Sequence, residues 1–493
     1  MNKSIFLLKL FFITVVLIFS CLIFTVNSVI ATENSIIDLN RPLQLRTQIS
    51  KPLTLNACVT MSLVNYPRIL QQQALIQAAK ANIRLRIIKE YMPEADLQYQ
   101  SIFASHNKTT QLMFSSDVFP ANMGPGNPSV SMKGYFFSGL GTVVDWAPLD
   151  FGLHKAKINV AKSELSQTEA GYASTKLDVA TRAAAGFLDV VVAQEQLKAS
   201  QANVERFDTF DRMVHTLVDS DLRPGADASL ADAQLAQARN QLIESRYKLE
   251  IAIADLSYSI GLGGKKIDID PGSIAQISQP TLTQQYPPVF KEHPLALAGN
   301  AIINTSMARV HVFDKMYVPT FHFLGGLNFR GAGLNTAGRS TAAYGGGVLP
   351  SAPNYDVAMI MDFPFLDFFR IKAARKVELY KVQAERQSYN LIMQSLQTED
   401  FRAKAQVKAA IELAANMPIQ VAAANDATVK ARTRYEVGLG TVAQVAEAEQ
   451  LLAKSVMQEA SARIGVWKAL LATANVHGNL KPFLSQVASM STH

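Results

Sequence analysis

The chain has 493 residues, more than a single compact core usually contains. Hydrophobic residues make up 48% and charged residues 18%, a composition that excludes a largely disordered chain. The net charge of +7 is modest, and no run of basic residues indicates a nucleic-acid partner.

The first 31 residues have the features of a signal peptide. Lys3 and Lys9 form a basic region, an apolar run covers 10–24, and we expect cleavage after Ala31. The stretch before Cys21 loosely resembles a lipoprotein cleavage site, so lipidation of Cys21 is an alternative. No later segment has the about 20 continuous apolar residues of a spanning helix. A mature chain that crosses a membrane would therefore have to use β-strands.

An internal repeat organises the rest of the chain. Pro67 recurs 227 residues later as Pro294, in each case at the end of a similar tripeptide. From Ala231, small and large residues alternate at steps of four and three, which is the 3.5-residue period of a coiled-coil seam. The same pattern returns 215 residues later. The two seams are Ala231, Leu235, Ala238, Leu242, Ser245, Leu249, Ala252 and Leu256, and then Ala446, Gln450, Ala453, Met457, Ala460, Ile464, Trp467 and Leu471.

Each half predicts a long helical hairpin. No proline occurs between Leu149 and Arg223, which allows a helix of about 65 residues, or about 100 Å. The corresponding helix of the second half contains Pro418, which predicts a kink or a local break. Turn-forming residues place the two hairpin tips near residues 219–228 and 436–442.

Four segments between the helices read as strands, at 95–103, 135–146, 320–324 and 356–363. Glycine-rich and proline-rich links, at 115–133 and 331–353, join them in pairs. Four strands cannot close a barrel alone, but twelve strands from three chains could. A small soluble β-domain on a coiled-coil stalk is the alternative, because the aromatic residues near the strand ends suit either structure.

Residues that would indicate an enzyme are missing from the sequence. The eight histidines include no His-x-x-x-His pair, and no Gly-x-Ser-x-Gly motif occurs. The glycine-rich stretch 261–266 follows a helix rather than a strand, so we read it as a helix stop and not as a phosphate loop. We therefore expect no catalytic residue, no metal site and no cofactor.

The sequence resembles the TolC-type outer-membrane efflux family from about Leu53 to about Gly478. The resemblance rests on the Asn-Tyr-Pro motif ending at Pro67, the prolines before the strands, and the Tyr-Glu-Val-Gly tip at 435–438. It implies a mainly helical fold with a β membrane part. Three chains would form a twelve-stranded β-barrel in outer-membrane lipid, continued by a periplasmic α-barrel made of the duplicated long hairpins.

The resemblance also divides the chain. A first repeat would follow the signal peptide, with strands at about 95–147 and a hairpin at 150–260; a linker and a second repeat would follow, with strands at about 319–365 and a hairpin at 367–477. The expected boundaries are 1–31 for the signal peptide, 32–262 for the first repeat, 263–286 for the linker, 287–478 for the second repeat and 479–493 for a tail.

Family members carry acidic residues just past the second tip, which line an aperture. The matching positions here are Gln444 and Glu447, and Asp232 is the first-repeat counterpart of Glu447. Rings of Glu447 and Asp232 around a threefold axis would repel one another when closed and would favour cations. Both side chains are equally explained as solvated carboxylates on a helix face.

The tips are also where the family docks its periplasmic adaptor. The candidate docking residues are Arg223, Gly225, Gly438, Gly440 and Thr441, although tight turns give the glycines a sufficient structural reason.

The implied function is the trimeric outer-membrane exit duct of a tripartite efflux system, passively conducting drugs and other small toxic molecules from the periplasm. Its partners would be a periplasmic adaptor and an inner-membrane pump or ABC transporter, with no nucleic acid and no catalysis. The alternatives are the duct of a type I protein secretion system and a periplasmic coiled-coil adaptor or scaffold that never spans a membrane.

Overall fold

The structure is a computed structural model that describes residues 52–105, 118, 133–275, 289–333, 346–350 and 352–490. The chain divides into two units, Met1–Ser50 and Lys51–His493, and the described residues belong to the second unit. The expected signal peptide, its cleavage after Ala31 and the alternative at Cys21 lie outside the described residues, as does most of the link at 115–133.

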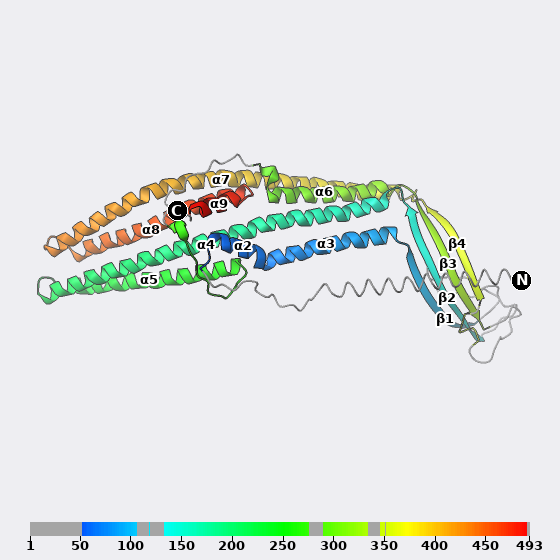
Figure 1. Ribbon diagram of the computed structural model, residues 1–493, viewed down its shortest axis with the longest axis horizontal. Coiled ribbons are helices and arrows are strands. Elements are labelled where there is room, and N and C mark those ends of the chain that lie inside the picture. Colours follow the sequence, from blue (N-terminus) through cyan, green and yellow to red (C-terminus); the bar gives the residue numbers. More distant parts are fainter. Residues whose placement is uncertain are drawn as a thin grey trace. The chain divides into compact units, whose positions relative to one another are not determined.

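Two helical hairpins make up most of the second unit. The first consists of α4 (Leu153–Asp219) and α5 (Gly225–Ser259), and the second of α7 (Phe368–Glu436) and α8 (Val442–Val476) (Figure 1). With 67 and 69 residues, α4 and α7 are each about 100 Å long, as the sequence predicted. Of the two alternatives expected at Pro418, the local break is wrong, because α7 is one continuous helix through it, and the kink stays a prediction. A proline removes only one amide donor, and the helix here tolerates that loss.

Shorter helices precede the strands in both halves. They are α2 (Leu55–Asn65), α3 (Pro67–Tyr91) and α6 (Pro294–Lys315). Pro67 and Pro294 each begin a helix, where the missing amide hydrogen has no partner to lose. This position explains why the two prolines recur in the repeat.

The C-terminal tail contains a further helix, α9 (Lys481–Met490), which the sequence did not indicate. Its Phe483 is buried, and its ring centroid lies 6.3 Å from that of Trp467 on α8. Of two short 3-10 turns, Gly272–Ala275 lies within the expected linker and Phe290–Glu292 lies just after it.

The predicted seams are the buried faces of α5 and α8. Most of the small seam residues are buried, including Ala231, Ala238 and Ala460. Because alanine has only a methyl side chain, each seam lets its helix approach the long helix beside it closely. Gln450 is the exception, since it is exposed and donates a hydrogen bond to Gln234 of α5 over 2.7 Å.

The two hairpins pack against each other through α4 and α8. The Thr181 hydroxyl of α4 donates to the Asn475 amide oxygen of α8 over 3.0 Å, and Gln196 donates to the Ser461 hydroxyl, also over 3.0 Å. Between these contacts, Phe187 of α4 is fully buried. The helical part is therefore one packed body rather than two independent stalks.

The strands form one antiparallel sheet in the order β1-β2-β3-β4. They are β1 (Glu94–Ser105), β2 (Gly134–Leu149), β3 (Thr320–Ala332) and β4 (Ala352–Asp362). All four expected strands are confirmed. β3 is longer than expected because its alternation continues past Leu324, and both β3 and β4 include residues at the ends of the link expected at 331–353. The central pair, β2 and β3, joins the two halves of the chain.

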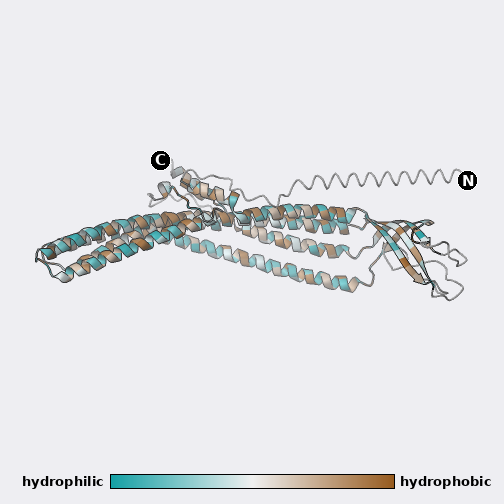
Figure 2. Ribbon diagram, turned by 90° about the horizontal axis from the view of Figure 1, so that it is seen from below, coloured by the Kyte–Doolittle hydropathy of each residue, from teal (hydrophilic) through white to brown (hydrophobic). Residues whose placement is uncertain are grey.

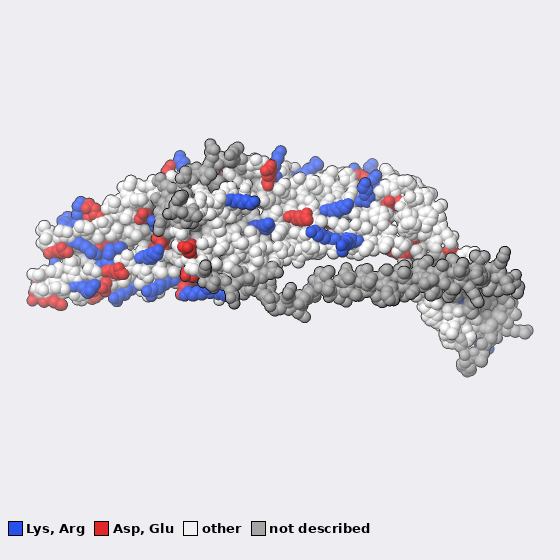
Figure 3. Space-filling model, viewed as in Figure 1, with Lys and Arg blue, Asp and Glu red and all other residues white. Residues whose placement is uncertain are grey.

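The surface of the helices is mixed in charge and in hydropathy. On the face shown in Figure 3, basic and acidic side chains are interspersed along the helices, and hydrophilic and hydrophobic residues alternate in Figure 2. Among the helices that the structure describes, none has the length and apolar character needed to cross a membrane.

Candidate functional site

The two hairpin tips turn by the same mechanism but with different residues. At the first tip, Asp221 takes a positive φ of 58°, and the next amide, of Leu222, donates to the Leu217 carbonyl over 3.0 Å. At the second tip, Gly438 takes a φ of 85°, and the Leu439 amide donates to the Arg434 carbonyl over 2.8 Å. Both are helix C-terminal turns with a left-handed residue.

We expected a positive φ to account for the tip glycines. For Gly225 and Gly440 this reason is wrong, because neither has a positive φ. Gly225 is the first residue of α5, and a Cβ placed there would meet open space. Gly440 is constrained by close packing instead, since a Cβ would lie 3.1 Å from the backbone nitrogen of Tyr435.

Two of the candidate tip residues form the cap of α8. The Thr441 hydroxyl accepts a hydrogen bond from the Gln444 amide over 3.4 Å, and the Gln444 side chain accepts one from the Thr441 amide over 3.3 Å. This reciprocal pair is a capping box. It gives Gln444, first considered as an aperture residue, a local structural role.

Tyr435 ties the second tip to the first. Its side chain is fully buried, and its hydroxyl donates to Asp227 of α5 over 3.1 Å. The Arg223 guanidinium lies 4.4 Å from the Tyr435 ring centroid and also donates to the Tyr435 carbonyl. Burial, and next the hydrogen bond to Asp227, raises the pKa of Tyr435 to about 12, so the hydroxyl stays a donor.

A buried apolar cluster surrounds this tie. It draws on four helices, and its members are Phe207, Phe210, Val214, Ala231, Leu235, Ala238, Tyr435, Val442 and Val445. We name these residues the tip cluster. Arg223 is therefore engaged between the tips rather than presented freely to a partner.

A buried ion triad lies two turns into α8. Glu449 has no exposed surface and pairs with Arg206 of α4 and Arg432 of α7. Arg432 also donates to the Arg206 carbonyl over 3.2 Å. Because a buried carboxylate is costly unless it is paired, the triad fixes three helices relative to one another near the tips.

The structure treats the two acidic aperture candidates differently. Glu447 is exposed and forms no ion pair with another described residue. Asp232 lies 3.2 Å from the His215 ring, and this hydrogen bond, chief among several effects, raises the pKa of His215. The charge of Asp232 is therefore partly engaged within its own hairpin.

At the other end of the helices, the sheet has two chemically distinct faces. The strand registers place alternate residues of all four strands together. The mainly apolar face carries Leu97, Tyr99, Phe103, Phe136, Leu140, Val144, Trp146, Phe321, Phe323, Leu327, Phe329, Tyr355, Val357, Met359 and Met361. The opposite face carries the charged and amide residues Glu94, Asp96, Gln98, Gln100, Asp145, His322, Asn328, Arg330, Asn354, Asp356 and Asp362, interspersed with Ile102, Tyr135, Phe137, Val143, Leu324 and Ile360.

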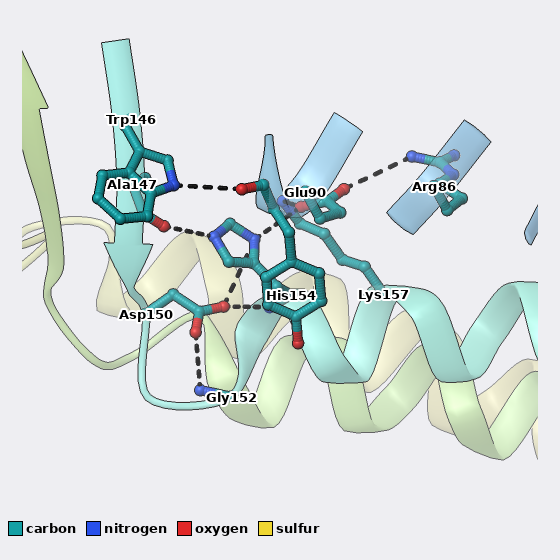
Figure 4. Close-up of polar contacts among 9 residues, drawn as sticks. Arg86, Glu90, Trp146, Ala147, Asp150, Gly152, His154 and Lys157 are labelled. Carbon is teal, nitrogen blue, oxygen red and sulfur yellow. Dashed lines mark hydrogen bonds and ion pairs between the residues drawn. The ribbon is translucent and has the colours of Figure 1, made fainter. Parts of the chain in front are cut away.

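A buried polar cluster joins this sheet to the helices (Figure 4). Glu90, at the end of α3, accepts hydrogen bonds from Lys157 over 2.8 Å and from His154 Nδ1 over 2.9 Å. The other ring nitrogen of His154 lies 2.8 Å from the Ala147 carbonyl, at the end of β2. Burial alone would raise the pKa of Glu90, but the hydrogen bonds from Lys157 and His154 outweigh it and lower the pKa.

The fold is shared with solved outer-membrane channels. It is similar to CusC, a transmembrane channel, with a TM-score of 0.70 and 13% identity over 89% of this chain and 96% of that one. It is also similar to the outer-membrane channel OprN, with a TM-score of 0.66 and 17% identity over 86% of this chain and 90% of that one. The Campylobacter jejuni CmeC outer membrane channel gives a TM-score of 0.67 and 15% identity over 89% of each chain. At these identities the likeness concerns the fold.

The family is indicated by a second comparison. Residues 298–478 match the family model for outer membrane efflux protein. No curated protein sequence matches the chain. Together, the family match and the shared fold confirm the resemblance to TolC-type outer-membrane efflux proteins and support the expected location in the outer membrane.

Several residues of the tips were missed in the sequence. Tyr435 was noted only as part of a motif, and its partner Asp227 lies 208 residues earlier, so no local pattern connects them. Glu449 lies on the same helix as the seam but off it. The pair of Asp211 and His215 had a signal in the sequence, because the two residues are four positions apart on one face of a helix. Asp232 lies on the other helix of the hairpin, so its contact with His215 had none.

Replacing Tyr435 with phenylalanine should destabilise the tips. The variant keeps the ring against Arg223 but removes the hydrogen bond to Asp227, which should lower the free energy of unfolding by about 1.5 kcal/mol. Chemical unfolding followed by circular dichroism would measure this. Tyr247→Phe is the control, because Tyr247 is an exposed tyrosine of α5; an equal loss in both variants would contradict the tie.

Replacing Glu90 with glutamine should lower stability in a pH-dependent way. Because folding lowers the pKa of Glu90, its contribution is complete above its unfolded pKa of about 4.3 and is lost as the pH falls through the folded pKa. We expect a loss of about 3 kcal/mol at pH 7 that shrinks below about pH 4. Denaturant midpoints measured across this range give the difference. Glu250→Gln, at an exposed position of α5, should show little change at either pH.

Proposed function

We propose that three copies of this chain form an outer-membrane exit duct that passively conducts small molecules from the periplasm to the exterior, within a tripartite efflux system. One observation carries the proposal: a four-stranded sheet with one mainly apolar face, one face that holds its charged residues, and two edges. β1 and β4 have no further strand partner among the described residues. Three such sheets joined edge to edge would present the apolar faces to lipid and the polar faces to a lumen.

The edge strand β4 supports association with another copy. Every residue of β4 is exposed, and on its apolar face Tyr355 and Val357 are 82% and 84% exposed. Long, exposed and apolar edge strands pair with other chains. Along α7, Phe369, Phe401 and Ile419 are also exposed, which favours a neighbouring protomer beside the helices as well.

The polar face suits a water-filled duct. Its acidic residues, Glu94, Asp96, Asp145, Asp356 and Asp362, outnumber Arg330, its one basic residue other than histidine. Threefold repetition of this face would give a lumen with acidic character, which favours cations over anions.

The hairpin tips would form the periplasmic end of the duct. Their exposed residues, among them Gly225, Gly438 and Thr441, are the surface we propose for docking a periplasmic adaptor, which in turn would contact an inner-membrane pump. The domain boundaries we propose are those that the resemblance implies, with repeats at 32–262 and 287–478.

Because the tie at Tyr435 joins the two tips of one chain, opening the duct would require that this tie or the contacts between chains change.

Arginine substitutions on the two faces of β4 test the assembly. In a membrane fraction, the wild-type chain should resist carbonate extraction and migrate as a heat-modifiable trimer. Val357→Arg should reduce the trimer several-fold, because arginine on a lipid-facing strand costs about 2–4 kcal/mol near the bilayer midplane. Ala358→Arg, on the polar face, is the matched control and should retain the trimer. A carbonate-soluble monomer, or equal loss in both variants, would contradict the proposal.

Glu447→Gln tests the aperture role. If Glu447 rings line the periplasmic opening, the variant channel should show a weaker preference for cations in a planar bilayer, measured by reversal potential under a salt gradient. Glu412→Gln, at an exposed position in the middle of α7, should leave the preference as it is. An unchanged cation preference in Glu447→Gln would refute the aperture role of Glu447. It would not bear on the proposed trimer.

A further inference from the structure

Three potential metal ligands converge between α4 and α5, near the first tip. Asp211 and His215 lie one turn apart on α4, and Asp232 faces them from α5, with one ligand atom of each within 4.8 Å of the others. His215 Nε2 lies 3.2 Å from Asp232 Oδ1 and 3.8 Å from Asp211 Oδ1. Two ligands bound to one zinc ion at 2.0–2.1 Å lie about 3.4 Å apart, so these separations are close to what a shared ion requires.

One ligand atom of this cluster lacks a hydrogen bond. Asp211 Oδ1 is shielded from solvent and has no hydrogen-bond partner among the described residues. A cation bound between the two carboxylates would pair with this oxygen and offset the repulsion between their charges.

We propose that Asp211, His215 and Asp232 bind a divalent transition-metal ion of the zinc type. One imidazole nitrogen and two carboxylate oxygens suit zinc and its neighbours better than magnesium or calcium, which prefer oxygen ligands alone. Three protein ligands leave at least one coordination position for water. The ion would link α4 to α5 beside the turn at 220–224 and stiffen the first hairpin where it meets the second.

The internal repeat supplies a comparison for this site. The residues 215 positions further along are Asp426, Lys430 and Glu447. There Lys430 Nζ lies 2.6 Å from Asp426 Oδ2, so an ammonium occupies the place that corresponds to the imidazole. A protonated lysine has no lone pair to offer a metal. Glu447 forms no ion pair with another described residue, so these three positions of the second hairpin do not show the convergence seen in the first, and we expect one such ion per chain.

His215→Lys is the decisive variant, because it reproduces in the first hairpin the aspartate–lysine pair of the second. The full chain, purified in detergent with a tag that contains no histidine, would be titrated with Zn²⁺ against a chromophoric chelator. We expect the wild type to bind one more Zn²⁺ per chain than His215→Lys. Asp232→Asn should weaken that binding by at least about tenfold. Circular dichroism and trimer migration would verify that each variant is folded.

His311→Gln is the matched control. His311 is an exposed histidine 3.2 Å from Asp314, but no second carboxylate of the described residues completes a cluster there. This variant should bind Zn²⁺ as the wild type does. Equal stoichiometry and affinity in wild type and His215→Lys would overturn the proposal and leave an ion pair between His215 and Asp232 only.

A second readout locates the ion. Zn²⁺ should slow amide hydrogen exchange several-fold in residues 211–232 of the wild type, and it should not do so in His215→Lys. Slowing of the same size in both proteins would show that the ion binds elsewhere and would also overturn the assignment.

Discussion

The long helices depend on the close approach that small seam residues allow. Alanine at positions such as 231, 238 and 460 lets α5 and α8 lie against α4 and α7 over most of their length, with larger residues interdigitated between the alanines. A 3.5-residue period keeps the seam facing its partner over many turns. Because each methyl group buries little area, the stability of the hairpins comes from length rather than from a few large contacts. The shape of each hairpin therefore depends on helices that run without a break, and α7 does so even through Pro418.

A seam of small apolar residues gives little resistance to one helix sliding along another. Buried polar groups provide that resistance. Glu449 near the tips and Glu90 near the sheet are both buried carboxylates held by cations from neighbouring helices. Each would be costly if its helix shifted by one residue, because the charge would lose its partners. The two clusters thus set the register of neighbouring helices at the two ends of the helical body. The small-residue seams set the distance between the helices.

Features with a local cause could be predicted, and those that join distant segments could not. The length of α4 follows from the absence of proline, whereas that of α7 follows from the repeat, since α7 contains Pro418; the strands follow from period-two alternation. The pairing of β2 with β3 joins halves of the chain that no short pattern connects. The contact of Tyr435 with Asp227 and Arg223 is of the same kind. Gly225 and Gly440 were misread because the residue type suggests a positive φ, whereas the chain turns at Asp221 and Gly438.

The duplication is close in geometry but not in chemistry, and the differences gather at the tips. Asp221 turns the first tip and Gly438 the second, and Arg223 reaches across to Tyr435 with no reciprocal arginine at Gly440. At the 215-residue offset of the two seams, His215 corresponds to Lys430 and Asp232 to Glu447. The first hairpin holds its charges in contacts between α4 and α5, while the second leaves Glu447 exposed. In a threefold assembly this asymmetry would give the ring of tips alternating character, with six hairpins but only three of each kind of surface for a partner to recognise.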